Sequence, residues 1–384
     1  MYNIITMVKR TFWLKKIEHL FKHRNIIWLY GVRRVGKTFL CKSIPDIIYY
    51  DCELPYVRKE IQSEYFLDNL KGKVIALDEI HKLDNPSELL KIAADYHKDI
   101  KIIATGSSLL SAYKKFKDTL TGRKYNLKIT PINSFDMKDF EITNLIERIR
   151  RGGLPQFLIS KDIILKDYAE WIDSYWAKDI AEIFRIEKRD SFIKFIELLF
   201  ARSGGIFEAN SYAAECEVSR HTIKSYLYAL DITSIINIVR PFATLKSREI
   251  VSAPKIYSFD TGFTVFMKGW KEIRNDDLGI LWEELVLNEI ISILEKPPNY
   301  WRDKFGHEVD FVLAKKNGEV IAIECKWNSS KADFSNLEIF RKKYPKGKNI
   351  IIAGDCRKPY AIKNKKMKIE IIGLQDVCRY LKNV

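Results

Sequence analysis

Residues 26–38 read Ile26-Ile27-Trp28-Leu29-Tyr30-Gly31-Val32-Arg33-Arg34-Val35-Gly36-Lys37-Thr38, and this stretch decides the fold. The apolar run 26–30 predicts a buried parallel strand. Residues 31–38 match the pattern G-x-x-x-x-G-K-[ST], and a predicted helix, 39–44, follows directly. Strand, glycine loop and helix in this order predict a loop whose backbone N–H groups close around phosphates.

The residue types in this loop assign the parts of a nucleotide site. Lys37 is expected to reach the β- and γ-phosphates as a catalytic residue, and Thr38 to offer its hydroxyl to magnesium. ATP and Mg²⁺ are therefore the expected cofactors. Arg33 and Arg34 could also face solvent or a partner subunit. The predicted cofactor-binding residues of the loop are Gly31, Val32, Arg33, Arg34, Val35, Gly36, Lys37, Thr38 and Phe39.

Two further strand ends carry polar residues. Residues 74–77 form an apolar run that ends in Asp78 and Glu79. We expect Asp78 to hold magnesium and Glu79 to polarise the attacking water, which implies hydrolysis as well as binding. The next strand ends in Thr105 and Ser107, either of which could sense the γ-phosphate. The alternative there is a plain turn with a helix cap at Ser107.

Similar apolar runs recur along the N-terminal part of the chain, at 47–50, 74–77 and 100–104, with helical stretches between them. This alternation predicts an α/β domain with a doubly wound parallel sheet. At about 150 residues per domain, the 384 residues suggest two or three domains. The pattern becomes helical at 152–155, so we predict domains over 1–150, 151–262 and 263–384.

A helix-turn-helix pattern lies in the second predicted domain, over residues 212–227. Ser219 is a natural N-cap for its second helix. With strands at 235–239 and 255–259, this pattern favours a winged helix that contacts DNA. The alternative is a helical linker that only transmits motion. The side chains expected to project from the second helix are Arg220, His221, Lys224 and Ser225.

Arg123 lies in a loop before the predicted strand 125–129. It could reach a phosphate as an arginine finger, either in its own chain or in another copy of a homo-oligomer. The alternative is a solvated arginine on a basic chain. The sequence does not decide between a monomer and a ring.

Acidic residues gather around a hairpin in the third domain. Asn317-Gly318, between strands 309–313 and 320–326, is a strong hairpin signal. Glu324 and Lys326 point to one face, and Asp310 lies on the neighbouring strand. Glu283, on the preceding helix, adds a carboxylate. Asp310, Glu324 and Lys326 are therefore candidate catalytic residues, with Glu283, Asp310 and Glu324 as magnesium ligands. The alternative is a set of surface ion pairs.

Composition and charge limit the partners. The chain has 47% hydrophobic and 30% charged residues and a net charge of +15. Residues 341–384 hold 13 Lys and Arg against three acids, a patch that attracts polyanions such as DNA, although a solvated lysine-rich surface is the alternative. No apolar run approaches the ~18 residues needed to cross a bilayer, so we expect no membrane partner and a cytoplasmic location. The scattered cysteines indicate neither zinc nor disulfides.

Motifs along nearly the whole chain resemble one family: the archaeal and bacterial AAA+ ATPases with a C-terminal domain of the PD-(D/E)XK nuclease type. The resemblance implies an AAA+ ATPase domain, a winged-helix segment and a restriction-endonuclease-like α/β domain. It favours an ATP-hydrolysing, DNA-associated protein; the alternative is an ATP-operated switch or scaffold whose C-terminal module only binds nucleic acid or protein. The motifs are Gly31 to Thr38, Leu77-Asp78-Glu79, Thr105-Gly106-Ser107-Ser108, Gly122-Arg123, Pro131, Gly152-Gly153-Leu154-Pro155, Lys255 with Asp260-Thr261-Gly262, Gly279 with Glu283, Glu308-Val309-Asp310 and Glu324-Cys325-Lys326.

Overall fold

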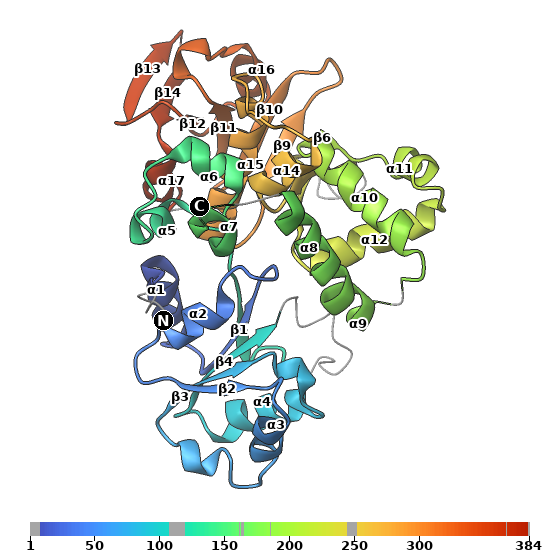
Figure 1. The fold of residues 1–384 in the computed structure, drawn as a ribbon. Helices are drawn as coiled ribbons and strands as arrows, with labels where there is room; N and C mark the ends of the chain where they lie inside the picture. The colour runs from blue at the N-terminus through green and yellow to red at the C-terminus, as the bar shows by residue number, and fades with distance from the viewer. Residues whose placement is uncertain are drawn as a thin grey trace.

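The structure is a computed structural model that describes residues 8–106, 120–160, 162, 165–184, 186–243, 252–365 and 367–382. In Figure 1 the N-terminal residues (blue to cyan) form the lower part of the molecule and the C-terminal residues (orange to red) the upper part. In the middle of the chain, residues 165–232 (green to yellow) lie to the right, whereas residues 134–159 lie at the left and centre, below the C-terminal part. Among the described residues, no helix is both long and apolar enough to cross a membrane.

The N-terminal sheet has five parallel strands in the order β2-β3-β4-β1-β5. Alternate residues of β1 enter different cores: Ile27 and Leu29 pack on one face, Ile26 and Trp28 on the other. Both faces are therefore covered, which explains the apolar run and confirms the predicted parallel α/β sheet. The strands are β1 (Ile26–Tyr30), β2 (Ile48–Asp51), β3 (Val74–Asp78), β4 (Lys101–Gly106) and β5 (Lys124–Lys128).

Helices cover this sheet on its two faces. Trp13 of α1 and Leu40 of α2 join the core that contains Ile27. Val57 of α3 and Leu90 of α4 join the opposite core. The elements are α1 (Thr11–Leu20), α2 (Lys37–Lys42), α3 (Pro55–Ile61) and α4 (Pro86–Tyr96), with the short turns η1 (Asp68–Leu70) and η2 (Ile80–Lys82).

Helices dominate the middle of the chain, as predicted. Ser219 caps α12, because its hydroxyl accepts the N–H of Thr222 at 3.0 Å. The helices are α5 (Ser134–Asp139), α6 (Leu145–Arg151), α7 (Pro155–Ile159), α8 (Leu165–Tyr175), the π-helical turn η5 (Trp176–Ile180), α9 (Ala181–Ile183), α10 (Arg189–Ala201), α11 (Ala209–Glu215), α12 (Arg220–Ile232) and α14 (Thr261–Met267).

A second sheet of nine strands joins the middle and C-terminal parts, in the order β13-β14-β12-β11-β10-β9-β7-β8-β6. The junction is a parallel pairing of β7 with β9, with Arg240 opposite Asn299. The sequence pattern did not indicate this pairing, since it predicted a strand at 235–239 but none at 299–302. The strands are β6 (Gly205–Ile206), β7 (Ile236–Pro241), β8 (Lys255–Ser258), β9 (Asn299–Arg302), β10 (Glu308–Ala314), β11 (Val320–Lys326), β12 (Asn349–Ala353), β13 (Tyr360–Asn364) and β14 (Met367–Ile372).

The predicted hairpin at Asn317-Gly318 is confirmed. β10 and β11 are antiparallel, with Phe311 opposite Ile323, and Gly318 has a φ of +81° that favours glycine. Helix α15 is almost wholly buried and packs against β11. The remaining elements are α15 (Leu278–Leu294), η6 (Ser329–Lys331), α16 (Ser335–Lys343), η7 (Leu374–Asp376) and α17 (Val377–Leu381).

Two motifs quoted from the sequence meet at the base of α14. The Asp260 carboxylate accepts the N–H groups of Gly153, at 2.5 Å, and of Gly262, at 3.0 Å. A Cβ on Gly152 would lie 1.8 Å from Asp260 Oδ1, and one on Gly262 would lie 2.6 Å from the Arg151 carbonyl. Only glycine allows this approach at both positions. Gly152 and Gly153 thus tie the end of α6 to the start of α14.

A carboxyl group lies buried next to this junction. Glu284 of α15 is 0% exposed, and its Oε2 accepts hydrogen bonds from Ser203 at 2.6 Å and Thr264 at 2.8 Å. Its Oε1 is buried with no hydrogen-bond partner in the structure. Burial raises the pKa of Glu284 to about 8. The folded protein therefore prefers the protonated acid at neutral pH.

We predict that Glu284→Gln is stabilising at alkaline pH. Because the folded-state pKa lies above the usual value near 4.5, the wild-type protein loses stability as pH rises from about 4.5 through about 8. Glutamine does not ionise and escapes this loss. The difference in Tm, variant minus wild type, should rise between pH 6 and pH 9. Glu197→Gln, at an exposed position of α10, is the control; a Glu284→Gln difference that is constant with pH would contradict the assignment.

Candidate functional site

The phosphate loop connects β1 to α2 through residues with positive φ. Gly31 has a φ of +153°, Arg34 +62° and Gly36 +99°. A Cβ on Gly31 would lie 2.4 Å from the Ile129 carbonyl oxygen, so this position requires glycine. The loop closes over Lys37, which is 7% exposed and donates to the carbonyls of Gly31 at 2.8 Å and Val32 at 3.2 Å. Burial lowers the pKa of Lys37, although Glu79, Asp179 and Asp78 oppose that effect.

Asp78 is the centre of the hydrogen bonds at the mouth of the loop. The Thr38 hydroxyl donates to Asp78 Oδ2 at 2.7 Å, and the hydroxyls of Thr105 and Tyr49 also donate to this carboxylate. Strand β4 lies between β1 and β3, which brings Thr105 between the loop and Asp78. The sequence pattern did not indicate Tyr49, because nothing in β2 distinguishes it from its neighbours. Hard oxygen ligands from Thr38 and Asp78 fit magnesium.

Glu79 follows Asp78 in a left-handed conformation, with a φ of +51°. Its N–H donates to Thr105 Oγ1 at 3.1 Å, and its carboxylate lies 3.3 Å from His81 Nδ1. Burial raises the pKa of Glu79 to about 7, although the Lys37 charge opposes this rise. A carboxylate with a pKa near neutrality is suited to act as a general base.

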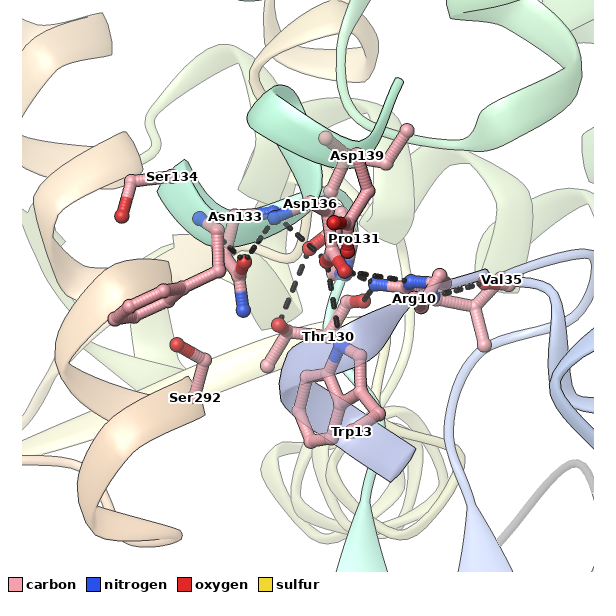
Figure 2. A network of polar contacts seen from close by, with 12 residues as sticks. Arg10, Trp13, Val35, Thr130, Pro131, Asn133, Ser134, Asp136, Asp139 and Ser292 are labelled. Carbon is pink, nitrogen blue, oxygen red and sulfur yellow. Dashed lines mark hydrogen bonds and ion pairs between the residues drawn. The ribbon is translucent and has the colours of Figure 1, made fainter. Parts of the chain in front are cut away.

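Arg10 supports the phosphate loop from behind, as Figure 2 shows. Its guanidinium donates to the Val35 carbonyl of the loop at 2.8 Å and to the Thr130 carbonyl at 3.1 Å. It also forms a buried ion pair with Asp136, at 2.5 Å. Trp13 Nε1 donates to the same carboxylate at 3.2 Å. Sequence reasoning missed Arg10, because an isolated arginine before a helix carries no signal for a partner 126 residues away.

The loop arginines have different environments. Arg33 donates to Ser174 Oγ at 3.1 Å and lies 3.6 Å from Asp179, which is 2% exposed. Ser174 ends α8 and Asp179 lies in the π-helical turn, so Arg33 faces the middle of the chain rather than solvent. Arg34 is exposed.

A cavity of about 680 Å³ opens beside the loop. Its volume suits a nucleotide, since small-molecule sites span roughly 300–1,000 Å³. One wall is the phosphate loop with Lys37 and Thr38, and the other is α7. Apolar side chains that line it include Phe39, Phe140, Pro155 and Ile159.

The structure places Arg123 away from this cavity. Arg123 precedes β5, and Lys124 pairs with Ile26 at the start of β1, whereas the phosphate loop follows the end of β1. The guanidinium forms two hydrogen bonds with Asp95, at 2.7 and 3.0 Å. The geometry therefore corrects the expectation of a finger within its own chain; a finger offered to another copy stays a prediction. Ser107 lies outside the described residues.

Asp310, Glu324 and Lys326 meet at the β10–β11 pair. Asp310 lies in a register shift of the β10–β9 pairing between Val309 and Val312, and its side chain accepts the Cys325 N–H at 2.7 Å. Lys326 Nζ lies 3.0 Å from Glu324 Oε2, while Glu324 Oε1 is buried with no hydrogen-bond partner in the structure. Burial and the charge of Asp310 raise the pKa of Glu324 to about 8. A buried carboxylate oxygen without a hydrogen-bond partner is chemically suited to bind a proton or a cation.

Glu283 of α15 approaches the same carboxylates, and the charge of Asp310 contributes to its raised pKa. It is held, however, by residues that the sequence did not assign: Lys255 Nζ lies 3.4 Å from Glu283 Oε1, and the Tyr257 hydroxyl donates to the same oxygen. Among the described residues, no three His, Cys, Asp or Glu side chains are arranged to hold a metal ion. Asp310 and Glu324 offer the oxygen ligands that a divalent cation prefers, whereas Glu283 is bound by Lys255 and Tyr257.

The predicted DNA-facing residues share one exposed surface. Arg220, His221, Lys224 and Ser225 are all exposed on α12, whereas Ile223 is buried. Most of the described Lys and Arg side chains of residues 341–382 are exposed as well. Arg341 differs, since it is 8% exposed and donates to Asn349 Oδ1 at 2.6 Å and to the Val320 carbonyl at 2.9 Å. Arg341 therefore supports the sheet rather than a partner.

The fold and this site define residues 23–137 as an AAA-type P-loop domain. The same residues match the family model described as an AAA domain. Residues 142–274 and 278–374 match two models described as domains of unknown function, DUF8612 and DUF4143. The three matched ranges are separated at 137–142 and 274–278, and the domains 1–150, 151–262 and 263–384 stay a prediction.

Similar proteins include an uncharacterized protein of Mycobacterium tuberculosis, 25% identical over 321 residues, which are 79% of this chain and 71% of that one. Another is an uncharacterized protein of Methanocaldococcus jannaschii, 25% identical over 77% of this chain and 73% of that one. Among solved structures, the Walker-type ATPase of Pyrococcus abyssi is 14% identical, with a TM-score of 0.43, over 68% of this chain and 96% of that chain. A TM-score this low carries no functional argument.

Proposed function

We propose that this protein is an ATP-hydrolysing AAA+ protein that acts on DNA, with a C-terminal module that is a magnesium-dependent nuclease. The observation that carries ATP hydrolysis is the convergence of Thr38, Asp78 and Glu79 at the mouth of the phosphate loop. Thr38 and Asp78 would hold Mg²⁺, which neutralises charge on the phosphates.

The roles of the other residues follow from their contacts. Lys37, now bound to the carbonyls of Gly31 and Val32, would exchange them for phosphate oxygens, a stronger and charge-assisted partner. Glu79 would accept a hydrogen bond from the attacking water and draw off its proton. Thr105 accepts the Glu79 N–H and donates to Asp78, so it would fix the positions of the two acids relative to each other.

The position of the cavity supports a link between nucleotide and the rest of the chain. Its far wall is α7, and Arg33 of the loop contacts Ser174 and Asp179 beyond it. A bound triphosphate would attract Arg33 away from Asp179, because both are anions competing for one guanidinium. Nucleotide state would thereby change the contacts of α8 and the π-helical turn.

The DNA-binding part of the proposal rests on the exposed polar face of α12 and on the basic C-terminal surface. The nuclease part rests on Asp310, Glu324 and Lys326, with the unpaired Glu324 oxygen as its strongest support. The alternative function, an ATP-operated switch or scaffold with a binding-only module, shares the ATPase site and lacks cleavage.

We predict that Glu79→Gln binds ATP normally but hydrolyses it at least ~100-fold more slowly, because the amide cannot accept the proton of water. Lys37→Ala should lose turnover through loss of phosphate contact. Phosphate release gives kcat, and titration with a fluorescent ATP analogue gives Kd. Glu60→Gln, at an exposed position of α3, should behave as wild type. A Glu79→Gln protein with the wild-type rate would remove Glu79 from the mechanism.

For DNA, we predict that replacing Arg220 and Lys224 with alanine makes the negative slope of log K against log salt concentration shallower by about one to two. Each cation that leaves a phosphate should reduce the slope by about one. Fluorescence anisotropy across salt concentrations measures it. Alanine at Lys71 and Lys73, which are exposed on the first domain, is the charge-matched control. An equal change in both variants would count against α12.

For cleavage, we predict that Asp310→Ala or Glu324→Ala abolishes metal-dependent nicking of supercoiled plasmid while ATP hydrolysis continues. Each change removes a carboxylate that would hold the cation of the C-terminal site, which is separate from the ATP site. Both variants should still shift DNA in a gel, more weakly as salt rises. Nicking that persists in both would return the module to binding alone.

A further inference from the structure

The ammonium group that contacts Glu283 comes from another part of the chain. Lys255 begins β8, a strand of the middle domain, and lies 3.4 Å from Glu283 while also pairing with Glu308. Its side chain is 7% exposed, so these carboxylates replace most of its water. Tyr257, on the same face of β8, donates its hydroxyl to Glu283 as well.

The charges of the cluster do not balance. Four carboxylates, those of Glu283, Glu308, Asp310 and Glu324, meet the ammonium groups of Lys255 and Lys326. Arg302, 45% exposed at the rim, adds a guanidinium 3.6 Å from Glu308. With all four acids ionised, the cluster would carry one more negative charge than positive charge. Glu324 pairs with Lys326 through Oε2, while its Oε1 is buried with no hydrogen-bond partner in the structure. Such an excess charge is neutralised either by a proton, as the raised pKa of Glu324 indicates, or by a bound cation.

We propose that Lys255 sets the cation affinity of the C-terminal site by holding Glu283. A divalent cation at Asp310 and Glu324 then has two protein carboxylates instead of three, and Lys255 competes with it for the third. This inference rests on the proposed nuclease-like site. It agrees with the lack, among the described residues, of three side chains arranged around one metal position.

Binding of Mn²⁺, followed by the electron paramagnetic resonance signal of the free ion, tests the inference on the full chain without nucleotide. The C-terminal share of binding is the part that Asp310→Asn removes. In the otherwise wild-type chain, Glu283→Gln should change this Kd by less than about twofold, because Lys255 already occupies Glu283. This arm does not depend on whether a Lys255 variant folds.

In the second arm, Lys255→Met should tighten Mn²⁺ binding at least ~10-fold, and adding Glu283→Gln should reverse the gain, because Glu283 becomes a ligand only when released. Lys315→Met is the matched control. Lys315 pairs with Glu319 at 3.8 Å at the far end of the β10–β11 hairpin, so its loss changes net charge equally. This control should leave the Kd nearly unchanged.

Three outcomes overturn the inference. A tenfold loss of Mn²⁺ affinity in Glu283→Gln alone would mean that Glu283 is already a ligand in the wild-type protein. Equal gains of affinity in Lys255→Met and Lys315→Met would mean that the effect comes only from the change in net charge. In both cases Asp310-dependent binding persists, so the nuclease proposal stands. No Asp310-dependent binding in any variant would overturn the inference and the metal-dependent nuclease together, and leave ATP hydrolysis untouched.

Discussion

The buried ion pair between Arg10 and Asp136 connects the phosphate loop to α1, to α5 and to the segment after β5. Through it, the Val35 carbonyl of the phosphate loop, Trp13 of α1 and Thr130 after β5 share one set of hydrogen bonds. In the same first turn of α5, Ser134 donates both its N–H and its hydroxyl to Glu289 of α15. Breaking such a pair from one side typically costs about 3–5 kcal/mol, because the remaining charge stays buried.

The two acidic sites are positioned in different ways. Asp78 and Glu79 follow from strand order alone, since parallel strands present their ends at one edge. The C-terminal carboxylates instead require a register shift at Asp310, a helix that brings Glu283 and a strand from another domain that brings Lys255. The second site therefore depends on three separate packing contacts.

The sequence was most informative where chemistry is local. The loop 31–38 and the pair Asp78-Glu79 are contiguous, and the hairpin at Asn317-Gly318 fixes which residues of β10 and β11 face each other. It was silent where a partner is remote: Arg10 and Tyr49 have ordinary neighbours in the chain, and Lys255 belongs to a quoted motif that did not indicate its partner Glu283. Arg123 shows the reverse error, because a loop position suggested a phosphate contact while strand direction places it at the opposite edge.

The pairing of β7 with β9 has a consequence for how the chain can be divided. A fragment that ended at residue 262 would leave β7 without its parallel neighbour and expose a row of unpaired backbone groups, a surface that invites strand addition and aggregation. A fragment that began at 263 would expose β9 in the same way. The middle and C-terminal parts should therefore be soluble only when they are expressed together. Insertions should be tolerated in their exposed loops but not within the β7–β9 pairing.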